Sequence, residues 1–268
     1  MIDLAIIIVN YKMREHVREC LTSLHQDLLR SSLDVRIVVV DNDSRDGIEG
    51  VIARSPLNNK ITSIILDENK GYGFGVNKGL QVVEARYYFV INPDITFFEH
   101  NTCERLVAFM ESHKHVGLAG PKLLNTDGTL QHSCWRFPRW YTPVVRRTFL
   151  GNTVWGQKEI ARFLMKDFDH MRTQPVDALM GSAMLVRGEL LASVGYMSDE
   201  YFMYFEDIDW CKTFWKHHKS VYYINNIVLR HGWQRASAKI KGVKAFFLDK
   251  LTRTHVKSAI KYFVKWGV

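Results

Sequence analysis

The alternation of two hydrophobic patterns over residues 1–95 constrains the fold most. Continuous apolar, mostly β-branched runs are typical of strands buried on both faces. Between them, apolar residues three or four positions apart are typical of helices, as at residues 13–29 and 75–85. The alternation predicts an α/β fold, a mainly parallel sheet flanked by helices, with ligands at the carboxyl ends of its strands. The four strand-like runs are LAIIIVNY (4–11), DVRIVVVDN (34–42), ITSIILDE (61–68) and YYFVINPD (87–94).

The pattern loosens in the second half of the chain. Residues 127–175 have no firm period and many aromatic and arginine residues, so we expect a long, partly mobile excursion and no separate domain. Strand and helix patterns return at residues 177–195, and a further strand pattern lies near residues 220–232. We therefore expect one domain over residues 1–234, with halves at 1–95 and 96–234, and an extension at 235–268.

The net charge of +8 lies in that extension. Residues 235–268 hold nine Lys or Arg and one acid, whereas the remaining 234 residues carry 27 of each sign. A neutral body argues against nucleic acid as a partner, because nucleic-acid binders spread positive charge over the face that meets the phosphates. The extension has apolar residues at 247, 251, 256, 260 and 263 among its lysines, which predicts a basic amphipathic helix. Such a helix either lies on an anionic membrane surface or packs its apolar face on the body.

Polar residues end the predicted strands. Asn10 ends the first, and Asp41 and Asp43 follow the second in VVVDNDSRDG. Asp and Asn are common turn formers, so this pattern alone is weak. A carboxylate beyond a buried strand can also accept the imide N–H of uracil or thymine.

The glycine-rich stretch NKGYGFGVNKG (69–79) does not match a dinucleotide-binding fingerprint. Lys78 and Val76 stand where that spacing needs glycine, and the stretch follows the third strand instead of the first. It is either a flexible turn or a loop that lets the backbone approach a phosphate ahead of a helix N-terminus. Under the second interpretation Lys70, Gly71 and Asn77 contact a nucleotide.

Two further stretches carry candidate chemistry. Asp94 in VINPDITF is a turn residue or a hard oxygen ligand for Mg²⁺ or Mn²⁺, and His231 is a candidate second ligand. The stretch YFMYFEDIDW (201–210) places Glu206, Asp207 and Asp209 among aromatic residues. These acids either cap a helix or include a general base, whose pKa the aromatic surroundings would raise.

Four scattered cysteines, at positions 20, 103, 134 and 211, form no CxxC pair, so we expect reduced and mostly buried thiols in a cytosolic protein. The N-terminal apolar run is too short for a signal peptide or a membrane span.

Taken in order, these stretches resemble the inverting nucleotide-sugar glycosyltransferases of family 2, which have the GT-A fold. The likeness is strongest to bacterial rhamnosyltransferases of O-antigen and cell-wall polysaccharide synthesis. It covers nearly the whole chain and also includes QHSCWRFP, GSAMLVRGE and LRHGW. The chain has no QxxRW motif of processive synthases, which implies transfer of a single sugar. It also has Ala178 where the family commonly has tryptophan, and GWQRAS where a glycine-rich stretch is common.

The resemblance implies residue roles. The 1–95 half would bind the nucleotide and the 96–234 half the acceptor, with Asp41 recognising the pyrimidine. NPD replaces the family's DxD, so Asn92 stands for the first acid and Asp94 holds Mg²⁺ or Mn²⁺, with His231 near the metal. Asp207 would be the general base, and Glu206 would orient the acceptor.

The resemblance also implies a function. It favours transfer of L-rhamnose from dTDP-L-rhamnose to a lipid-linked or growing polysaccharide acceptor, such as a polyprenyl-diphosphate sugar, by an enzyme bound peripherally to the inner face of the cell membrane. Alternatives are a UDP-hexose or galactofuranose donor, or a non-catalytic sugar-nucleotide or glycan-binding relative. A nucleic-acid binder is a third hypothesis.

Overall fold

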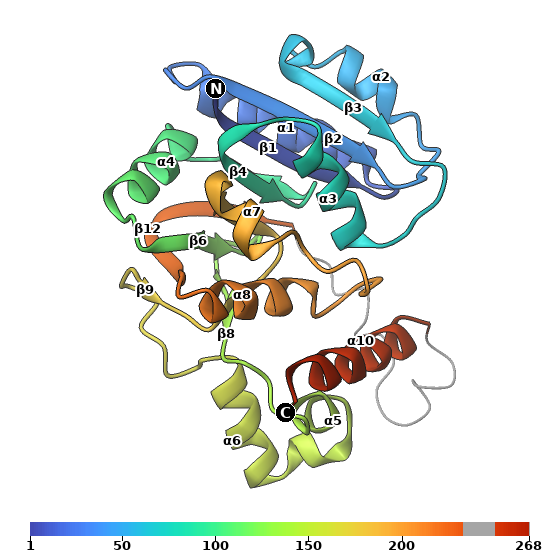
Figure 1. The fold of residues 1–268 in the computed structure, drawn as a ribbon, viewed down its shortest axis with the longest axis vertical. Helices are drawn as coiled ribbons and strands as arrows, with labels where there is room; N and C mark the ends of the chain where they lie inside the picture. Colours follow the sequence, from blue (N-terminus) through green and yellow to red (C-terminus); the bar gives the residue numbers. More distant parts are fainter. Residues whose placement is uncertain (233–249, 268) are drawn as a thin grey trace.

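The computed structural model describes residues 1–232 and 250–267 of the 268-residue chain. The first half shows the predicted alternation of strands and helices (Figure 1). Its elements are β1 (Ile2–Asn10), α1 (Arg14–Leu28), β2 (Val35–Asp41), α2 (Ile48–Ala53), η1 (Asn58–Lys60), β3 (Ile61–Ile65), α3 (Tyr72–Gln81) and β4 (Ala85–Ile91).

The second half adds strands of two to twelve residues and helices of up to seventeen residues. The strands are β5 (Ile95–Thr96), β6 (Val116–Leu124), β7 (Leu130–Gln131), β8 (Cys134–Trp135), β9 (Gln174–Pro175), β10 (Ala178–Leu179), β11 (Ala183–Arg187) and β12 (Ser220–His231). The helices are α4 (Thr102–Ser112), α5 (Thr142–Arg147), η2 (Phe149–Asn152), α6 (Val154–Phe163), η3 (Gly188–Leu190), α7 (Leu191–Val194), α8 (Glu206–Lys216) and α10 (Lys250–Trp266).

One mixed sheet joins both halves. Its strand order is β3-β2-β1-β4-β11-β6-β12-β5, with β7 paired to β6 and β9 to β12. The neighbours β3, β2, β1 and β4 are parallel, and β12 is parallel to β6. β11 is antiparallel to both of its neighbours, β4 and β6, and the short β5, β7 and β9 are also antiparallel to theirs. The predicted mixed, mainly parallel sheet flanked by helices is therefore confirmed.

Apolar side chains cover both faces of this sheet. Ile6 and Ile8 of β1 belong to the core that includes α1 and α4, whereas Ile7 and Val9 face the core that includes α3 and α8. Burying one such side chain stabilises the fold by about 1.5–3 kcal/mol. A Cβ on Gly79 would lie only 2.5 Å from Ile7 Cγ2, so this glycine lets α3 pack closely on β1. The close packing brings the N-terminus of α3 to the edge where the strands end.

β3 differs from the prediction of a strand buried on both faces. It is the outermost strand of the sheet, and its side chains are exposed or half-buried, with Ile65 47% exposed. An edge strand has only one neighbour, so an apolar run alone does not show whether a strand is central or peripheral.

The predicted irregular excursion contains three short helical segments, α5, η2 and α6, between β8 and β9. The longest of them has ten residues, so a helical period is hard to recognise in the sequence. Buried Glu159 joins two of these helices, because it accepts hydrogen bonds from Thr142 of α5 and from Arg162 of its own helix.

The C-terminal helix α10 packs on the body, which is one of the two arrangements left open above. Tyr262 and Ala259 are buried in the core that includes α8, whereas Ile260 and Val264 are 59% and 78% exposed. Phe247, the first residue of the predicted apolar face, lies outside the described residues, as does the whole 235–249 segment. Within the described residues, no helix is both long and apolar enough to cross a bilayer.

Two other expectations can be compared with the structure. All four cysteines are free and buried, as expected. The division at residue 95 stays a prediction, and the sheet is continuous across it, since β4 pairs with β11.

Candidate active site

The first group of polar residues lies where β1 and β2 end. Asn10 and Asp41 are partners in the parallel register, so both side chains emerge at the same edge. Asn10 Nδ2 donates to Asp41 Oδ1 at 2.7 Å, and the Ser44 backbone N–H donates to Asp41 Oδ2 at 3.0 Å. A cavity of about 240 Å³ opens here, lined by Asp41, Asp43, Arg45, Asp46, Glu49, Ile65, Leu66 and Asp67.

Asp43 lies at the exposed side of this cavity. Its backbone has a φ of +60°, and Arg45 Nε donates to its carboxylate at 2.9 Å. Asp41 and Asp43 therefore line one cavity, with the buried Asp41 fixed by neighbours and Asp43 more accessible.

The glycine-rich loop lies against the segment that precedes α8. Gly71 has a φ of +106°, and a Cβ there would lie 2.2 Å from the Phe202 carbonyl oxygen. The same oxygen accepts the N–H of Tyr72, the first residue of α3, at 3.0 Å. Further along α3, Asn77 Nδ2 donates to the Met197 carbonyl at 2.7 Å. Lys70 is exposed, beside Glu68 and the Phe74 ring. Gly71 and Asn77 thus connect the two halves of the chain. A nucleotide contact for Lys70, Gly71 and Asn77 stays a prediction.

The second polar group lies around the end of β12. His231 Nε2 is 3.2 Å from Asp94 Oδ1 and 3.4 Å from Asn92 Nδ2. The other ring nitrogen, Nδ1, lies 2.7 Å from Gln131 Oε1. Gln131 Nε2 donates to Asn125 Oδ1 at 3.0 Å, which fixes the orientation of the glutamine amide. Because Oε1 can only accept, Nδ1 of His231 carries a proton and donates it to Gln131, while Nε2 faces Asp94.

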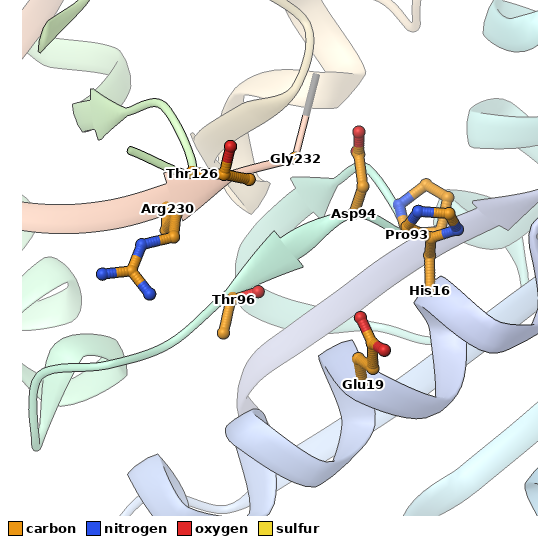
Figure 2. Close-up of a pocket in the computed structure, with 8 residues that line it drawn as sticks. All are labelled: His16, Glu19, Pro93, Asp94, Thr96, Thr126, Arg230 and Gly232. Carbon is orange, nitrogen blue, oxygen red and sulfur yellow. The ribbon is translucent and has the colours of Figure 1, made fainter. Parts of the chain in front are cut away.

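Asp94 also borders a cavity of about 210 Å³ on the side of α1 (Figure 2). Figure 2 shows Pro93 and Asp94 at the turn ahead of β5, with His16 and Glu19 projecting from α1 and Arg230 from β12. Asp94 is thus accessible, with 10% of its side chain exposed, whereas His231 is buried.

The third group is the start of α8. Asp207 is held by two backbone donors: the Gly181 N–H reaches Oδ2 at 2.9 Å and the Ile208 N–H reaches Oδ1 at 2.8 Å. Burial outweighs these bonds and raises the pKa of Asp207 from 3.8 to about 6. Burial and the nearby Asp207 charge raise the pKa of Glu206 well above its usual value. Glu206 Oε2 is buried with no hydrogen-bond partner among the described residues.

Asp209 belongs to the same helix but to a different set of contacts. Its carboxylate accepts hydrogen bonds from Lys265 Nζ at 2.6 Å and from Trp266 Nε1 at 2.7 Å, both in α10. It therefore faces away from Asp207, as expected if a helix begins here.

The loop ahead of β11 brings the acid pair and the Asn92–Asp94 turn together. Gly181 holds Asp207 through its N–H and accepts the Tyr72 hydroxyl at 2.7 Å through its carbonyl, and the Ser182 carbonyl accepts the Asn92 N–H at 2.9 Å. Burial, and then the charges of Glu206, Asp207 and Asp94, raise the pKa of Tyr72 well above its usual value. The charges of carboxylates from both halves of the chain thus act on one half-buried tyrosine.

Sequence comparison decides the family. Residues 5–194 match the model of "Glycosyl transferase family 2". The chain belongs to glycosyl transferase family 2.

Curated relatives of this family 2 chain are about a quarter identical to it over the aligned residues. A low-salt glycan biosynthesis hexosyltransferase, Agl10, of Haloferax volcanii is 26% identical over 213 residues, covering 78% of this chain but only 60% of that protein. The N-acetylglucosaminyl-diphospho-decaprenol L-rhamnosyltransferase of Mycobacterium tuberculosis is 26% identical over 221 residues, covering 77% and 68%.

Solved glycosyltransferases share the fold. TarS of S. aureus in complex with UDP-GlcNAc matches with a TM-score of 0.59 at 15% identity, covering 95% of this chain and 66% of that one. GalNAc-T7 with UDP, GalNAc and Mn²⁺ gives 0.63 at 10% identity, covering 98% and 48%. These matches confirm the predicted GT-A fold.

The sequence did not single out Gln131, Tyr72 or Gly181. All three lie within stretches that carried the family resemblance. Only the fold shows that Gln131 contacts His231, that Gly181 contacts Asp207, and that Tyr72 contacts Gly181.

Proposed function

We propose that this family 2 chain is an inverting glycosyltransferase in which Asp207 is the general base. The observation that carries the proposal is the environment of this carboxylate, which is half-buried at the start of α8 and has a pKa raised to about 6. A base with this pKa is mostly ionised at neutral pH and still able to accept a proton. The acceptor oxygen bonds to the anomeric carbon, the bond from that carbon to the diphosphate breaks, and Asp207 takes the hydroxyl proton.

The nucleotide belongs in the cavity at the ends of β1 and β2. Asp41 is bound to Asn10 and Ser44 through one lone pair of each oxygen, so each oxygen retains a second lone pair. One of them can accept the imide N–H of a pyrimidine. Asp43, Lys70, Gly71, Asn77 and Asn92 are proposed to surround the rest of the nucleotide.

A divalent cation fits between Asp94 and His231. Nε2 of His231 faces the Asp94 carboxylate at 3.2 Å, so either a proton on Nε2 or a bound cation can link the two groups. Within the described residues no group of three or more His, Cys, Asp or Glu could hold a metal. The chain would therefore supply two such ligands, and a diphosphate and water the rest, as is common for Mg²⁺. A bound Mg²⁺ or Mn²⁺ would neutralise charge on the leaving diphosphate.

The proposed donor is dTDP-L-rhamnose and the proposed acceptor is a polyprenyl-diphosphate-linked or growing polysaccharide. The mycobacterial relative, an L-rhamnosyltransferase named for a lipid-linked acceptor, supports this assignment. A UDP-hexose is the alternative, since the similar TarS structure holds UDP-GlcNAc. A non-catalytic role is disfavoured, because holding buried Glu206 and half-buried Asp207 in surroundings that disfavour their charges costs stability that binding alone does not require.

We also propose that the end of the molecule formed by α5, η2, α6 and α10 binds an anionic membrane surface (Figure 1). Residues 136–166 hold seven Lys or Arg and one acid, and residues 251–267 hold four and none. The exposed large apolar residues here are Trp140, Val144, Phe149, Val154 and Trp155, and Ile260 and Val264 of α10. Arg147 Nη1 donates to Thr252 Oγ1 at 2.9 Å and so joins α5 to α10. Aromatic and basic side chains together suit a lipid headgroup region.

Vesicle sedimentation tests this surface. The unaltered chain should bind vesicles of phosphatidylglycerol and bind phosphatidylcholine much more weakly, and Trp140→Ser with Trp155→Ser should reduce binding. Equal binding of the unaltered chain and this double variant would contradict the proposal.

The first experiment for the activity is nucleotide release from a panel of sugar nucleotides with Mn²⁺ or Mg²⁺ and an EDTA control. Metal-dependent turnover of dTDP-rhamnose supports the full proposal. Turnover of a UDP-sugar alone would retain the mechanism and reject the donor. Absence of turnover and of metal-dependent binding for every donor would reject the catalytic role.

A further inference from the structure

Helix α10 is hydrogen-bonded to the loop that leads into α8. Ser258 Oγ donates to the Met203 carbonyl at 2.8 Å, and Lys261 Nζ donates to the Glu200 carbonyl. Both acceptors belong to the backbone of residues 200–205, directly ahead of Glu206. The C-terminal helix therefore restrains the main chain of this loop.

The loop has an unfavourable backbone where α10 touches it. Tyr204 and Phe205 both have a φ of +72°, in the left-handed region that costs a non-glycine residue about 1–3 kcal/mol. The Phe205 ring lies 5.3 Å from each of the Tyr262 and His255 rings, and the Tyr204 ring lies 5.0 Å from His255. Such conformations persist only where the surroundings fix them, and here side chains of α10 contact both residues.

Asp209 provides the third contact. It is 1% exposed, and Lys265 and Trp266 of α10 donate to its two carboxylate oxygens. Asp209 and Asp207 lie in the same first turn of α8, so fixing Asp209 restricts the position of Asp207. The two carboxylates point to different partners, α10 for Asp209 and the Gly181 N–H for Asp207.

We propose that α10 is a positioning element for Asp207, with Lys265 and Trp266 as its main positioning residues. The helix holds the 200–205 loop and the first turn of α8 so that Asp207 stays bonded to Gly181. The same loop bonds Tyr72 of the glycine-rich stretch through Phe202, so α10 also stabilises the contact between the two halves of the site. This inference rests on the proposed role of Asp207 as the base.

Two variants and one matched control test it. Lys265→Met leaves the Asp209 charge unpaired, and Trp266→Phe removes only the indole donor and so disturbs folding less. Lys257→Met removes an exposed lysine of the same helix, which belongs only to the proposed membrane surface and so takes no part in donor hydrolysis in solution. We expect kcat for donor hydrolysis to fall about 10- to 100-fold in the two variants, because small misplacements of catalytic groups have effects of this size. The KM for the donor should change less than about threefold, and the control should match the unaltered chain.

Amide hydrogen exchange of residues 204–209 gives a readout independent of activity. We expect exchange to accelerate in Lys265→Met and Trp266→Phe and to stay unchanged in Lys257→Met. Unchanged exchange in both variants would overturn the proposal whatever the activity. Faster exchange with unchanged kcat would overturn the positioning role. If the unaltered chain turns over no donor, the proposed function fails, and the exchange data still decide whether α10 restrains this segment.

Discussion

The carboxylates on the two sides of the site differ in burial and hydrogen bonding. At the ends of β1 and β2, Asp41 is buried and both of its oxygens are hydrogen-bonded. At the start of α8, Glu206 is buried, and its Oε2 has no hydrogen-bond partner in the part of the chain that the structure describes; burial also outweighs the two N–H donors of Asp207. A group that must hold a ligand benefits from fixed neighbours, whereas a group that must accept a proton needs an environment that disfavours its charge.

Replacing each acid by its amide should separate these two roles and gives the largest expected effect. Asp207→Asn should lower turnover about 10²–10⁴-fold, the usual contribution of a general base, with the donor Kd nearly unchanged. Asp41→Asn should instead weaken binding of the sugar nucleotide. The asparagine amide can present an N–H group where the pyrimidine N–H needs a hydrogen-bond acceptor. Steady-state kinetics and titration calorimetry measure both quantities, with exposed Asp169→Asn as the control. A purely structural role for Asp207 predicts normal turnover in the folded variant.

The features of the site that the sequence could predict are those that depend on local patterns. Strands β1, β2 and β4 and the meeting of Asn10 with Asp41 follow from local periodicity and from the rule that parallel strands end at one edge. The pairing of Asp209 with Lys265 spans 56 residues, and that of His231 with Gln131 spans 100, so no local pattern reports them. The apolar run of β3 likewise does not show that this strand lies at the edge of the sheet, because strand order is set by contacts between distant parts of the chain. The positive φ of Tyr204 and Phe205 arises from tertiary contacts that no propensity predicts.

Gly71 lies at the contact between the two sides, and its substitution should have the next largest effect. An alanine Cβ at φ +106° would meet the Phe202 carbonyl at 2.2 Å, so the backbone must move. We expect Gly71→Ala to lower the free energy of unfolding by at least about 3 kcal/mol, combining backbone strain with displacement of the loop. Gly128→Ala is the matched control and should cost about 1 kcal/mol, since Gly128 has a φ of +82° and, chain neighbours aside, no atom of the described residues lies within 4 Å of its Cβ position. Equal losses in urea denaturation would show that the contact with Phe202 contributes nothing.

Gln131 tests whether the proposed metal position depends on support from a neighbouring residue. Gln131→Leu should free the His231 ring to change its tautomer and weaken Mn²⁺ affinity about 10- to 100-fold, as is typical when the partner of a ligating histidine is lost. The Mn²⁺ concentration for half-maximal donor turnover, together with Mn²⁺ titration followed by electron paramagnetic resonance, measures the change. Exposed Gln157→Leu should have no effect. Unchanged Mn²⁺ affinity in Gln131→Leu would argue against His231 as a ligand.

The pH dependence of stability gives the smallest effect and tests the acid pair without any substrate. Because the folded-state pKa of Asp207 is raised from 3.8 to about 6, the folded chain binds more protons than the unfolded chain between these values. The stability that this group contributes is therefore fully present below about pH 4 and is lost as the pH rises through about 6. Glu206 shifts in the same direction. Glu206→Gln removes one of the two charges, so its free energy of unfolding relative to the unaltered chain should rise between pH 5 and pH 8. Urea denaturation at both pH values measures this difference, with exposed Glu84→Gln as the control. A constant difference across this range would mean that Glu206 is as well solvated in the folded chain as in the unfolded one, and the contrast with the fully paired Asp41 would no longer hold.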